Sequence, residues 1–222
     1  MGEISPAYTD RGMIETVMST INRLNRYTTL PVLLDLLARK KVVLLDPDRW
    51  EDRNDAELIS EYKSRKECGS VLAICFSSGE ETIHDWKTYA DGVSGCCIQF
   101  DPDSFLRSFP EEKGFRHQKV EYHRIDERFR IEVDDIPFTK RRPYRCEEEY
   151  RIIWHGPAGV RRKEVRVDLD SITRITVSQK MPSRVFATIK DLLGGVQGRH
   201  GHRVIHSTLY RNKRWIRKFR DA

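Results

Sequence analysis

The chain has 222 residues, of which 38% are hydrophobic and 33% are charged. This balance is typical of a globular domain and excludes a disordered chain. The apolar runs are much shorter than the roughly 20 residues of a membrane-spanning helix, and the first ten residues lack the pattern of a secretory signal. We therefore expect a cytoplasmic protein without a membrane partner. The net charge of +6 permits an anionic partner but does not require one.

Hydrophobic spacing predicts a helix over residues 11–24, followed by a short extended segment over 25–29. Pro31 stands where a helix can begin without losing a hydrogen bond, and an apolar strand follows at 42–45. The remaining helices are predicted over 56–66, 82–90, 101–109 and 184–193, and the remaining strands over 71–77, 95–101, 119–122, 148–154, 165–169, 172–177 and 203–207.

Strands and short helices therefore alternate irregularly along the chain. They lack the regular rhythm of a doubly wound parallel sheet, and neither a GxGxxG motif nor a P-loop occurs. The sequence predicts an α+β fold in a single domain over residues 1–222. Within it, residues 1–23 form an N-terminal helical extension and residues 211–222 form a basic tail.

Cysteines, histidines and the basic tail give weaker indications. Five cysteines without a CxxC spacing predict reduced thiols and no structural zinc site. His200, His202 and His206 lack suitably spaced Cys or acidic partners, so we expect exposed loop histidines and no metal.

In the tail, Trp215 and Phe219 lie among arginines and lysines. The tail is either a solvated end or a phosphate-contacting patch with stacking surfaces, and both interpretations stay open.

Four segments of the chain are distinctive in their order and spacing. They read NRYTTLPVLLDLLARKKVVLLDPDRWEDRND, LAICFSS, WKTYADGVSGCCIQFD and YRCEEEYRIIW. Together they resemble the bacterial family catalogued as domain of unknown function 2971. The resemblance extends from about residue 24 to residue 210, with the WKTYADG block as its most specific part. The chain departs from the family pattern at Arg53, which stands directly before Asn54 and Asp55.

The layout of this family looks like a reduced ADP-ribosyltransferase fold, in which two small sheets hold NAD between them. The resemblance therefore implies a split, mostly antiparallel sheet core over residues 24–210, with NAD as substrate and no metal. It also implies site residues. Arg26 takes the first position and Ser77 the second, and Glu149 takes the late acidic position, with Glu147 as the first acid of an E-x-E pattern.

These residue types suit the chemistry that the resemblance implies. Cleavage of the bond between nicotinamide and ribose builds positive charge on the sugar, which a carboxylate such as Glu149 stabilises. Arg26 can bind the pyrophosphate or a ribose through its planar fork of donors. Tyr27 and Tyr89 are candidate walls for the nicotinamide ring, because flat rings stack well. Glu147 is a candidate for positioning or deprotonating the acceptor.

Each candidate also has a purely structural interpretation. Alternation along the strand predicted over 148–154 places Glu147 and Glu149 on one face, where both can pair with Arg145 or Arg151 at the surface. Cys75 and His84 belong to no recognisable nucleophilic motif. The other structural interpretations are an ion-pair partner for Arg26, a strand-end hydroxyl for Ser77, core packing for Trp86 and Tyr89, and a helix cap for Asn54 and Asp55.

The sequence thus predicts an NAD-dependent ADP-ribosyltransferase that acts as a toxin or anti-phage defence effector. RNA, DNA or a protein is the expected acceptor, and an antitoxin is a candidate partner. The first alternative is a non-catalytic module of the same fold that binds a nucleotide or nucleic acid through Arg26 and the basic tail. The second is a metal-dependent nuclease built on Asp46, Asp48 and Asp52, although the arginines of that loop favour internal charge pairing.

Overall fold

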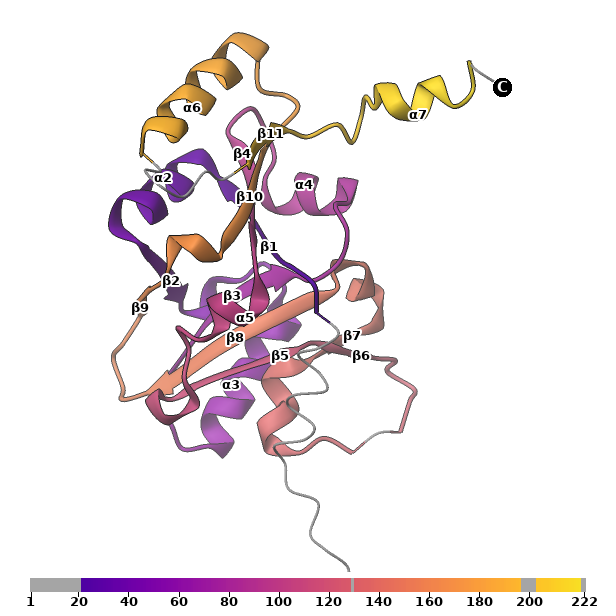
Figure 1. Ribbon diagram of the computed structural model, residues 1–222. Helices are drawn as coiled ribbons and strands as arrows, with labels where there is room; N and C mark the ends of the chain where they lie inside the picture. Colours follow the sequence, from indigo (N-terminus) through magenta and orange to yellow (C-terminus); the bar gives the residue numbers. More distant parts are fainter. Residues whose placement is uncertain (1–20, 129, 197–202, 221–222) are drawn as a thin grey trace, which may run out of the picture.

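The computed structural model describes residues 21–128, 130–196 and 203–220, and a twisted sheet runs through their centre (Figure 1). The strands of this sheet are β1 (Leu24–Thr29), β2 (Lys41–Leu45), β3 (Ser70–Ser77), β4 (Gly95–Phe100), β5 (Phe115–Lys119), β8 (Glu149–Gly156), β9 (Arg162–Arg166), β10 (Ile172–Val177) and β11 (Arg203–His206). In the described part of the chain their order is β11-β10-β4-β1-β3-β2-β9, and β8 and β5 extend from β3.

The sheet is mostly antiparallel and splits near its middle. Among the paired strands, only β10 with β11 runs parallel in this sheet, and β6 (Glu121–His123) and β7 (Thr139–Arg141) form a separate parallel pair within the described residues. β1 pairs with β3 at one position, Asn25 with Ser77, whereas β1 follows β4, and β3 follows β8, along their whole lengths. The predicted α+β fold with a split, mostly antiparallel core is confirmed.

Helices and 3-10 turns flank the sheet, and several of them begin at a side-chain cap. They are α2 (Leu30–Arg39), α3 (Arg53–Arg65), α4 (Ile83–Tyr89), α5 (Pro102–Leu106), α6 (Ser183–Val196) and α7 (Lys213–Arg217), with 3-10 turns η1 (Pro47–Arg49), η2 (Glu111–Lys113), η3 (Val133–Phe138), η4 (Arg142–Glu147) and η5 (Leu169–Ser171). Asp52 accepts a hydrogen bond from the Asn54 N–H at the start of α3. At the start of α4, the Thr82 hydroxyl oxygen accepts a hydrogen bond from the Asp85 N–H. These caps fix the helix entries beside the split in the sheet.

Both faces of β3 and β8 are buried, which explains their nearly continuous apolar sequences. One face contributes to the main core, with Leu72, Ile74 and Phe76 from β3 and Tyr150, Ile152 and Trp154 from β8. The other face packs under α3 and η3 through Val71, Ala73 and Ile153. Because side chains alternate along a strand, Cys75, Ser77, Glu149 and Arg151 continue this second face, which is therefore polar at one end.

Several predicted boundaries were wrong. The helix predicted over 11–24 falls mostly outside the described residues, but its last residue, Leu24, belongs to β1. The strand predicted over 119–122 is two strands, because β5 pairs with β8 while β6 pairs with β7. The strand predicted over 165–169 begins and ends earlier, as β9, since Asp168 caps η5 and turns the chain. The helix predicted to end before Gly194 continues to Val196.

The basic tail contains a short helix that was not predicted. α7 lies away from the rest of the molecule (Figure 1), and none of its residues is buried. Trp215 and Phe219 contact each other edge to face at a centroid distance of 5.1 Å and stay exposed. Both interpretations of the tail therefore stay open. In the described part of the chain, no helix has the length and apolar character needed to span a bilayer.

Candidate functional site

A pocket of about 470 Å³ lies where β1 and β3 diverge. Cavities of this size are typical of small-molecule sites. β1 contributes Asn25, Arg26 and Tyr27 to its lining, and β3 contributes Cys75 to Ser77. The other lining residues come from three segments, and they are Trp50, Glu51, Asp52, Asp55, His84, Asp85, Thr88, Tyr89, Lys140, Tyr144, Glu147 and Glu149. All six residues predicted for the site therefore line one pocket.

Arg151 organises the buried side of this pocket. Its side chain is fully buried, and its Nε donates to Glu149 Oε1 at 2.8 Å. Its Nη2 donates to Asp55 Oδ2 at 2.8 Å, and its Nη1 donates to the Pro137 carbonyl at 2.7 Å. Asp55 stands in the first turn of α3, so the guanidinium joins β8 to that helix and to η3. A guanidinium with all three nitrogens engaged holds Glu149 in a fixed position.

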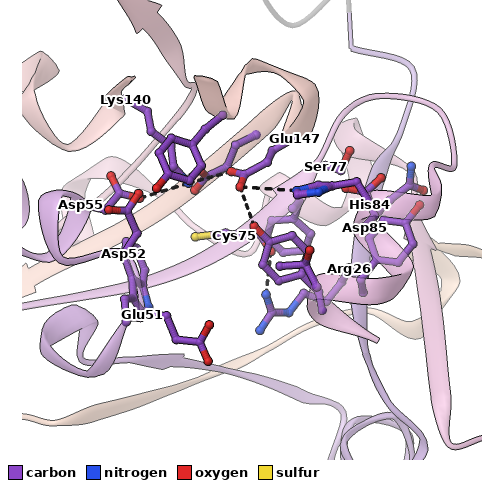
Figure 2. A pocket seen from close by; sticks show the side chains of 18 residues that line it. Arg26, Glu51, Asp52, Asp55, Cys75, Ser77, His84, Asp85, Lys140 and Glu147 are labelled. Atoms are coloured by element: carbon purple, nitrogen blue, oxygen red, sulfur yellow. Dashed lines mark hydrogen bonds and ion pairs between the residues drawn. The ribbon is translucent and has the colours of Figure 1, made fainter. Parts of the chain in front are cut away.

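Lys140 joins the three carboxylates into one network. The Nζ of this β7 residue lies 2.6 Å from Glu147 Oε2, 3.1 Å from Glu149 Oε2 and 3.3 Å from Asp55 Oδ2. Figure 2 shows Lys140, Asp55 and Glu147 along one side of the pocket, with Arg26 across from them. All four ionic side chains, Lys140 and its three partners, are less than a tenth exposed. We call these three acids with Lys140 and Arg151 the charge cluster.

The charge cluster keeps Glu149 ionised. Burial alone would raise the pKa of its carboxyl, but Arg151 and Lys140 outweigh burial and lower that pKa from the ordinary 4.5 to about 2. The same carboxylates raise the pKa of the Lys140 ammonium, although desolvation opposes them. Burial, reinforced by Glu149, raises the pKa of the Cys75 thiol. Cys75 therefore stays protonated beside the cluster and lacks the thiolate of a reactive nucleophile.

Arg26 and Ser77 lie on the facing strands of the split. Arg26 Nη1 donates to the Cys75 carbonyl at 2.8 Å, the one hydrogen bond this side chain makes within the described residues. Its remaining donors are available to a ligand. Burial lowers the pKa of the Arg26 guanidinium from its ordinary value, and the negative charge of Glu149 opposes this effect. Ser77 is buried, and its Oγ accepts from the Gly79 N–H at 3.3 Å, which matches its structural interpretation.

The aromatic candidates differ in how much surface they present. Tyr27 is buried and packs edge-on against Trp86 at a centroid distance of 5.6 Å, within a small core cluster. Tyr89 is 45% exposed and donates from its hydroxyl to Glu147 Oε1 at 2.8 Å. Of these three side chains, Tyr89 alone combines an exposed ring with a place in the pocket lining. Trp86 is core packing, as its structural interpretation held.

Glu147 and Glu149 do not share one face of a strand, as alternation along the predicted strand 148–154 had implied. β8 begins at Glu149, Glu147 ends the 3-10 turn η4, and Glu148 between them has a left-handed backbone with φ 41°. The Glu148 carbonyl accepts from both the N–H and the Oγ of Ser78 at 2.8 Å, which stabilises this turn. The two acids reach the pocket because the chain turns at Glu148, and their cationic partners are buried rather than at the surface.

Sequence reasoning did not assign three members of the site to it. Asp55 was interpreted as a helix cap, but Asp52 is the cap and Asp55 belongs to the charge cluster. Lys140 was not singled out, since it lies in a three-residue strand with no apolar periodicity. His84 is 4.0 Å from Glu147 Oε1 through Nε2 and lines the pocket. A cap position followed by a second acid was the one available signal for Asp55.

The acidic loop shows capping contacts where a nuclease would need metal ligands. Asp46 accepts from the Asp48 N–H, and Asp52 accepts from the Asn54 N–H. Arg53 donates to the Asp48 carbonyl at 3.0 Å. Within the described residues, no group of three or more His, Cys, Asp or Glu side chains is arranged to hold a metal ion. The expectation of an exposed loop histidine was wrong for His206, which ends β11, is half-buried and stacks on Phe186 at a centroid distance of 4.4 Å. His200 and His202 lie outside the described residues.

Glu149 should make stability depend on acid pH. A carboxyl whose pKa is lowered by folding stabilises the native state above its unfolded pKa, and this contribution is lost as pH falls through the folded pKa. For Glu149 the window runs from 4.5 down to about 2. We expect the free energy of unfolding, measured by urea denaturation, to fall across this window less steeply in Glu149→Gln than in the wild type.

The neighbouring substitution Glu148→Gln is the matched control for this pH series. The Glu148 side chain is half exposed and lies 4.0 Å from Lys119, outside the charge cluster. It should keep the wild-type slope. Equal slopes in all three proteins would show that Glu149 is not held at a lowered pKa.

Two solved structures of DarT from Thermus sp. 2.9 are similar to this chain. The structure in complex with NAD+ has a TM-score of 0.45 and 10% sequence identity, and the match covers 85% of this chain and 96% of that one. The structure in complex with ADP-ribosylated ssDNA has a TM-score of 0.43 and 13% identity, with 84% and 94% covered. Similarity at this level carries no functional conclusion. No protein-family model matches the chain, and no curated protein matches it significantly, so the family resemblance stays a prediction.

Proposed function

We propose that the pocket binds NAD and transfers its ADP-ribose to an acceptor. The bond between C1′ of the ribose and the nicotinamide nitrogen breaks, and its electron pair leaves with nicotinamide. C1′ then bonds to an acceptor oxygen or nitrogen, which loses its proton. The observation that carries the proposal is that Arg26 and an ionised Glu149 line one pocket at the split of the sheet.

The charge cluster suits the positive charge that develops on the ribose. Its three acids and two bases leave a formal net charge of −1, held by ion pairs in a buried setting. A fixed negative site needs no reorganisation when an oxocarbenium forms, so it favours the transition state over the ground state. Among the members of the charge cluster, Glu149 is the one whose charge acts on the pKa of Arg26. We therefore assign this role to Glu149.

The remaining residues supply places for the rest of the dinucleotide. Arg26 has open donors for the pyrophosphate, and a planar guanidinium grips phosphate oxygens in pairs. The Ser77 hydroxyl proton is available to a ribose oxygen, because its oxygen acts as acceptor toward Gly79. The exposed ring of Tyr89 offers a stacking wall for nicotinamide, whereas the Tyr27 ring is buried against Trp86.

A non-catalytic binding module remains the second candidate function. One observation favours it, because both Glu149 oxygens and both Glu147 oxygens already accept hydrogen bonds from protein donors. A carboxylate can accept about four such bonds, so capacity for substrate is reduced without being lost. The wider role as a toxin or anti-phage effector, and the antitoxin partner, stay proposals from the sequence.

Incubation with NAD labelled in its adenine half separates the two candidates. Release of nicotinamide, followed by chromatography, together with label on a macromolecule of a cell extract, would support transfer. Binding of NAD in calorimetry without nicotinamide release, in the presence of the same extract, would support the binding module. If the protein neither binds NAD nor releases nicotinamide from it, both candidate functions are refuted.

Arg26→Ala should lower kcat/KM for NAD by about 10- to 150-fold. This range corresponds to about 1.5–3 kcal/mol for hydrogen bonds to a charged group. Arg26→Lys should recover only part of the loss, since an ammonium lacks the planar fork. The measurement is initial rates of nicotinamide release across NAD concentrations.

Arg107→Ala is the matched control for the Arg26 variants. Arg107 is an exposed arginine that also donates to a backbone carbonyl, that of Asp103, but lies outside the pocket. It should leave kcat/KM within about twofold of the wild type, because surface changes away from a site have small effects. An Arg26→Ala protein with wild-type kinetics would remove Arg26 from the site.

A further inference from the structure

A second concavity, of about 580 Å³, lies beside the candidate site and is strongly basic. Four arginines, Arg124, Arg141, Arg142 and Arg145, line it together with one acid, Asp126, so its arginines and acid sum to a charge of +3. Arg124 pairs with Asp126 at 3.3 Å. Arg141, Arg142 and Arg145 are exposed and form no ion pair with any acid in the described part of the chain. We call this concavity the arginine groove.

The arginine groove and the pocket share a wall. In β7, Lys140 points into the charge cluster and its neighbour Arg141 lines the groove, as strand alternation requires. η4 is divided in the same way, because Arg142, Pro143 and Arg145 line the groove while Tyr144 and Glu147 line the pocket. The groove and the pocket are therefore lined by residues of the same segment, with Arg145 in the groove and Glu147 in the pocket.

We propose that the arginine groove binds a single strand of nucleic acid through its phosphodiester backbone and presents it to the pocket as the acceptor. The acceptor role rests on the proposed function, whereas the binding does not. Three unpaired guanidiniums are more than one phosphate group requires, and they are enough in number to contact successive phosphates of a strand. The lining also includes Pro143 and Ile125, and Ile125 is 84% exposed. Apolar surface among the cations suits the faces of unpaired bases, which a duplex covers.

The basic tail does not explain this groove. α7 lies well apart from β6 and β7 (Figure 1). Three cationic residues of the basic tail, Arg214, Arg217 and Lys218, are exposed and equal in charge to the three unpaired groove arginines. The two basic regions can therefore be removed separately, with the same change in net charge.

Binding of a fluorescein-labelled single strand of about 15 nucleotides to the full chain, without NAD, tests the proposal by fluorescence anisotropy. The variants are the groove triple Arg141→Ala, Arg142→Ala, Arg145→Ala and the tail triple Arg214→Ala, Arg217→Ala, Lys218→Ala. The groove triple should weaken binding at least tenfold and reduce the slope of log affinity against log salt by about 2, at about 0.7 per lost phosphate contact. The tail triple should change the slope by less than half as much. Thermal unfolding verifies that both variants are folded.

Other outcomes would overturn the proposal. Equal losses in the two triples would mean that binding follows net charge alone, and a loss confined to the tail triple would place the site on the tail. Displacement of the strand by inorganic phosphate at equal affinity would make the groove a small-anion site. A duplex of the same sequence that binds as tightly would refute the preference for a single strand. Because no NAD is present, none of these results depends on whether the pocket turns it over.

Discussion

Glu149→Gln is expected to lower nicotinamide release from NAD by about two to three orders of magnitude. Glutamine keeps the shape of the side chain but removes the charge that faces the developing oxocarbenium. In the wild type, Arg151 Nε donates to Glu149 Oε1 at 2.8 Å, and the glutamine oxygen can accept the same hydrogen bond. The glutamine amide nitrogen would then face the Lys140 ammonium. The loss should appear in kcat, because the ground state of the sugar carries no positive charge for Glu149 to bind. Steady-state rates over a range of NAD concentrations measure it.

Two comparisons keep this result interpretable. Glu148→Gln removes the same charge from the adjacent residue, whose side chain is half exposed and outside the charge cluster, and it should retain wild-type rates. Thermal unfolding of Glu149→Gln reveals whether the lost activity is lost structure. A folded Glu149→Gln protein with more than a tenth of the wild-type kcat would contradict the assigned role.

Arg151→Ala is expected to cost about 3–5 kcal/mol of unfolding free energy. Its removal would leave Asp55 and Glu149 buried with Lys140 as their shared cation, and would leave the Pro137 carbonyl without its donor. Uncompensated buried charge is among the most destabilising changes known for single substitutions. Urea denaturation of both proteins at neutral pH measures the difference.

Arg65→Ala is the matched control for Arg151→Ala. Arg65 pairs with Glu61 at 2.6 Å, but both side chains are about half exposed, so its loss should cost no more than about 0.5 kcal/mol. The double variant Asp55→Ala, Arg151→Ala should be less destabilised than the sum of the two single variants, since each charge is left unpaired only when its partner remains. Additive losses would mean that the pair is not coupled.

Much of the sheet could be predicted from sequence, because β3 is an apolar run and β4 and β10 are rich in apolar and β-branched residues. Arg26, Ser77 and Glu149 came from a resemblance between motifs, and the structure places them around one pocket. Their catalytic roles stay predictions. The charge cluster itself could not be predicted, because Asp55 and Arg151 are 96 residues apart and nothing local marks their contact. The turn at Glu148 was equally hidden, because a left-handed residue is expected at glycine rather than at glutamate.

The arginine groove was also beyond sequence reasoning, for a different reason. Arg141, Arg142 and Arg145 form a conspicuous basic run, but a run of charge is usually a solvated surface. Its interest comes from the parallel pairing of β6 with β7, which places His123 opposite Arg141 and brings the Arg124 segment beside the Arg141 segment. Pairing between two three-residue strands leaves no periodic signal in a sequence.

The charge cluster stabilises the fold and also lines the proposed site, and this affects how relatives of this protein should be compared. Glu149, Lys140 and Arg151 hold β8, β7 and α3 together, so a lineage without the proposed transfer activity would still be under selection to keep them for folding. Their presence in a relative is therefore poor evidence that it is active. The Arg26 side chain makes a single hydrogen bond to the part of the chain that the structure describes, so drift could replace it at little structural penalty. Its retention is the more informative marker of the proposed transfer activity.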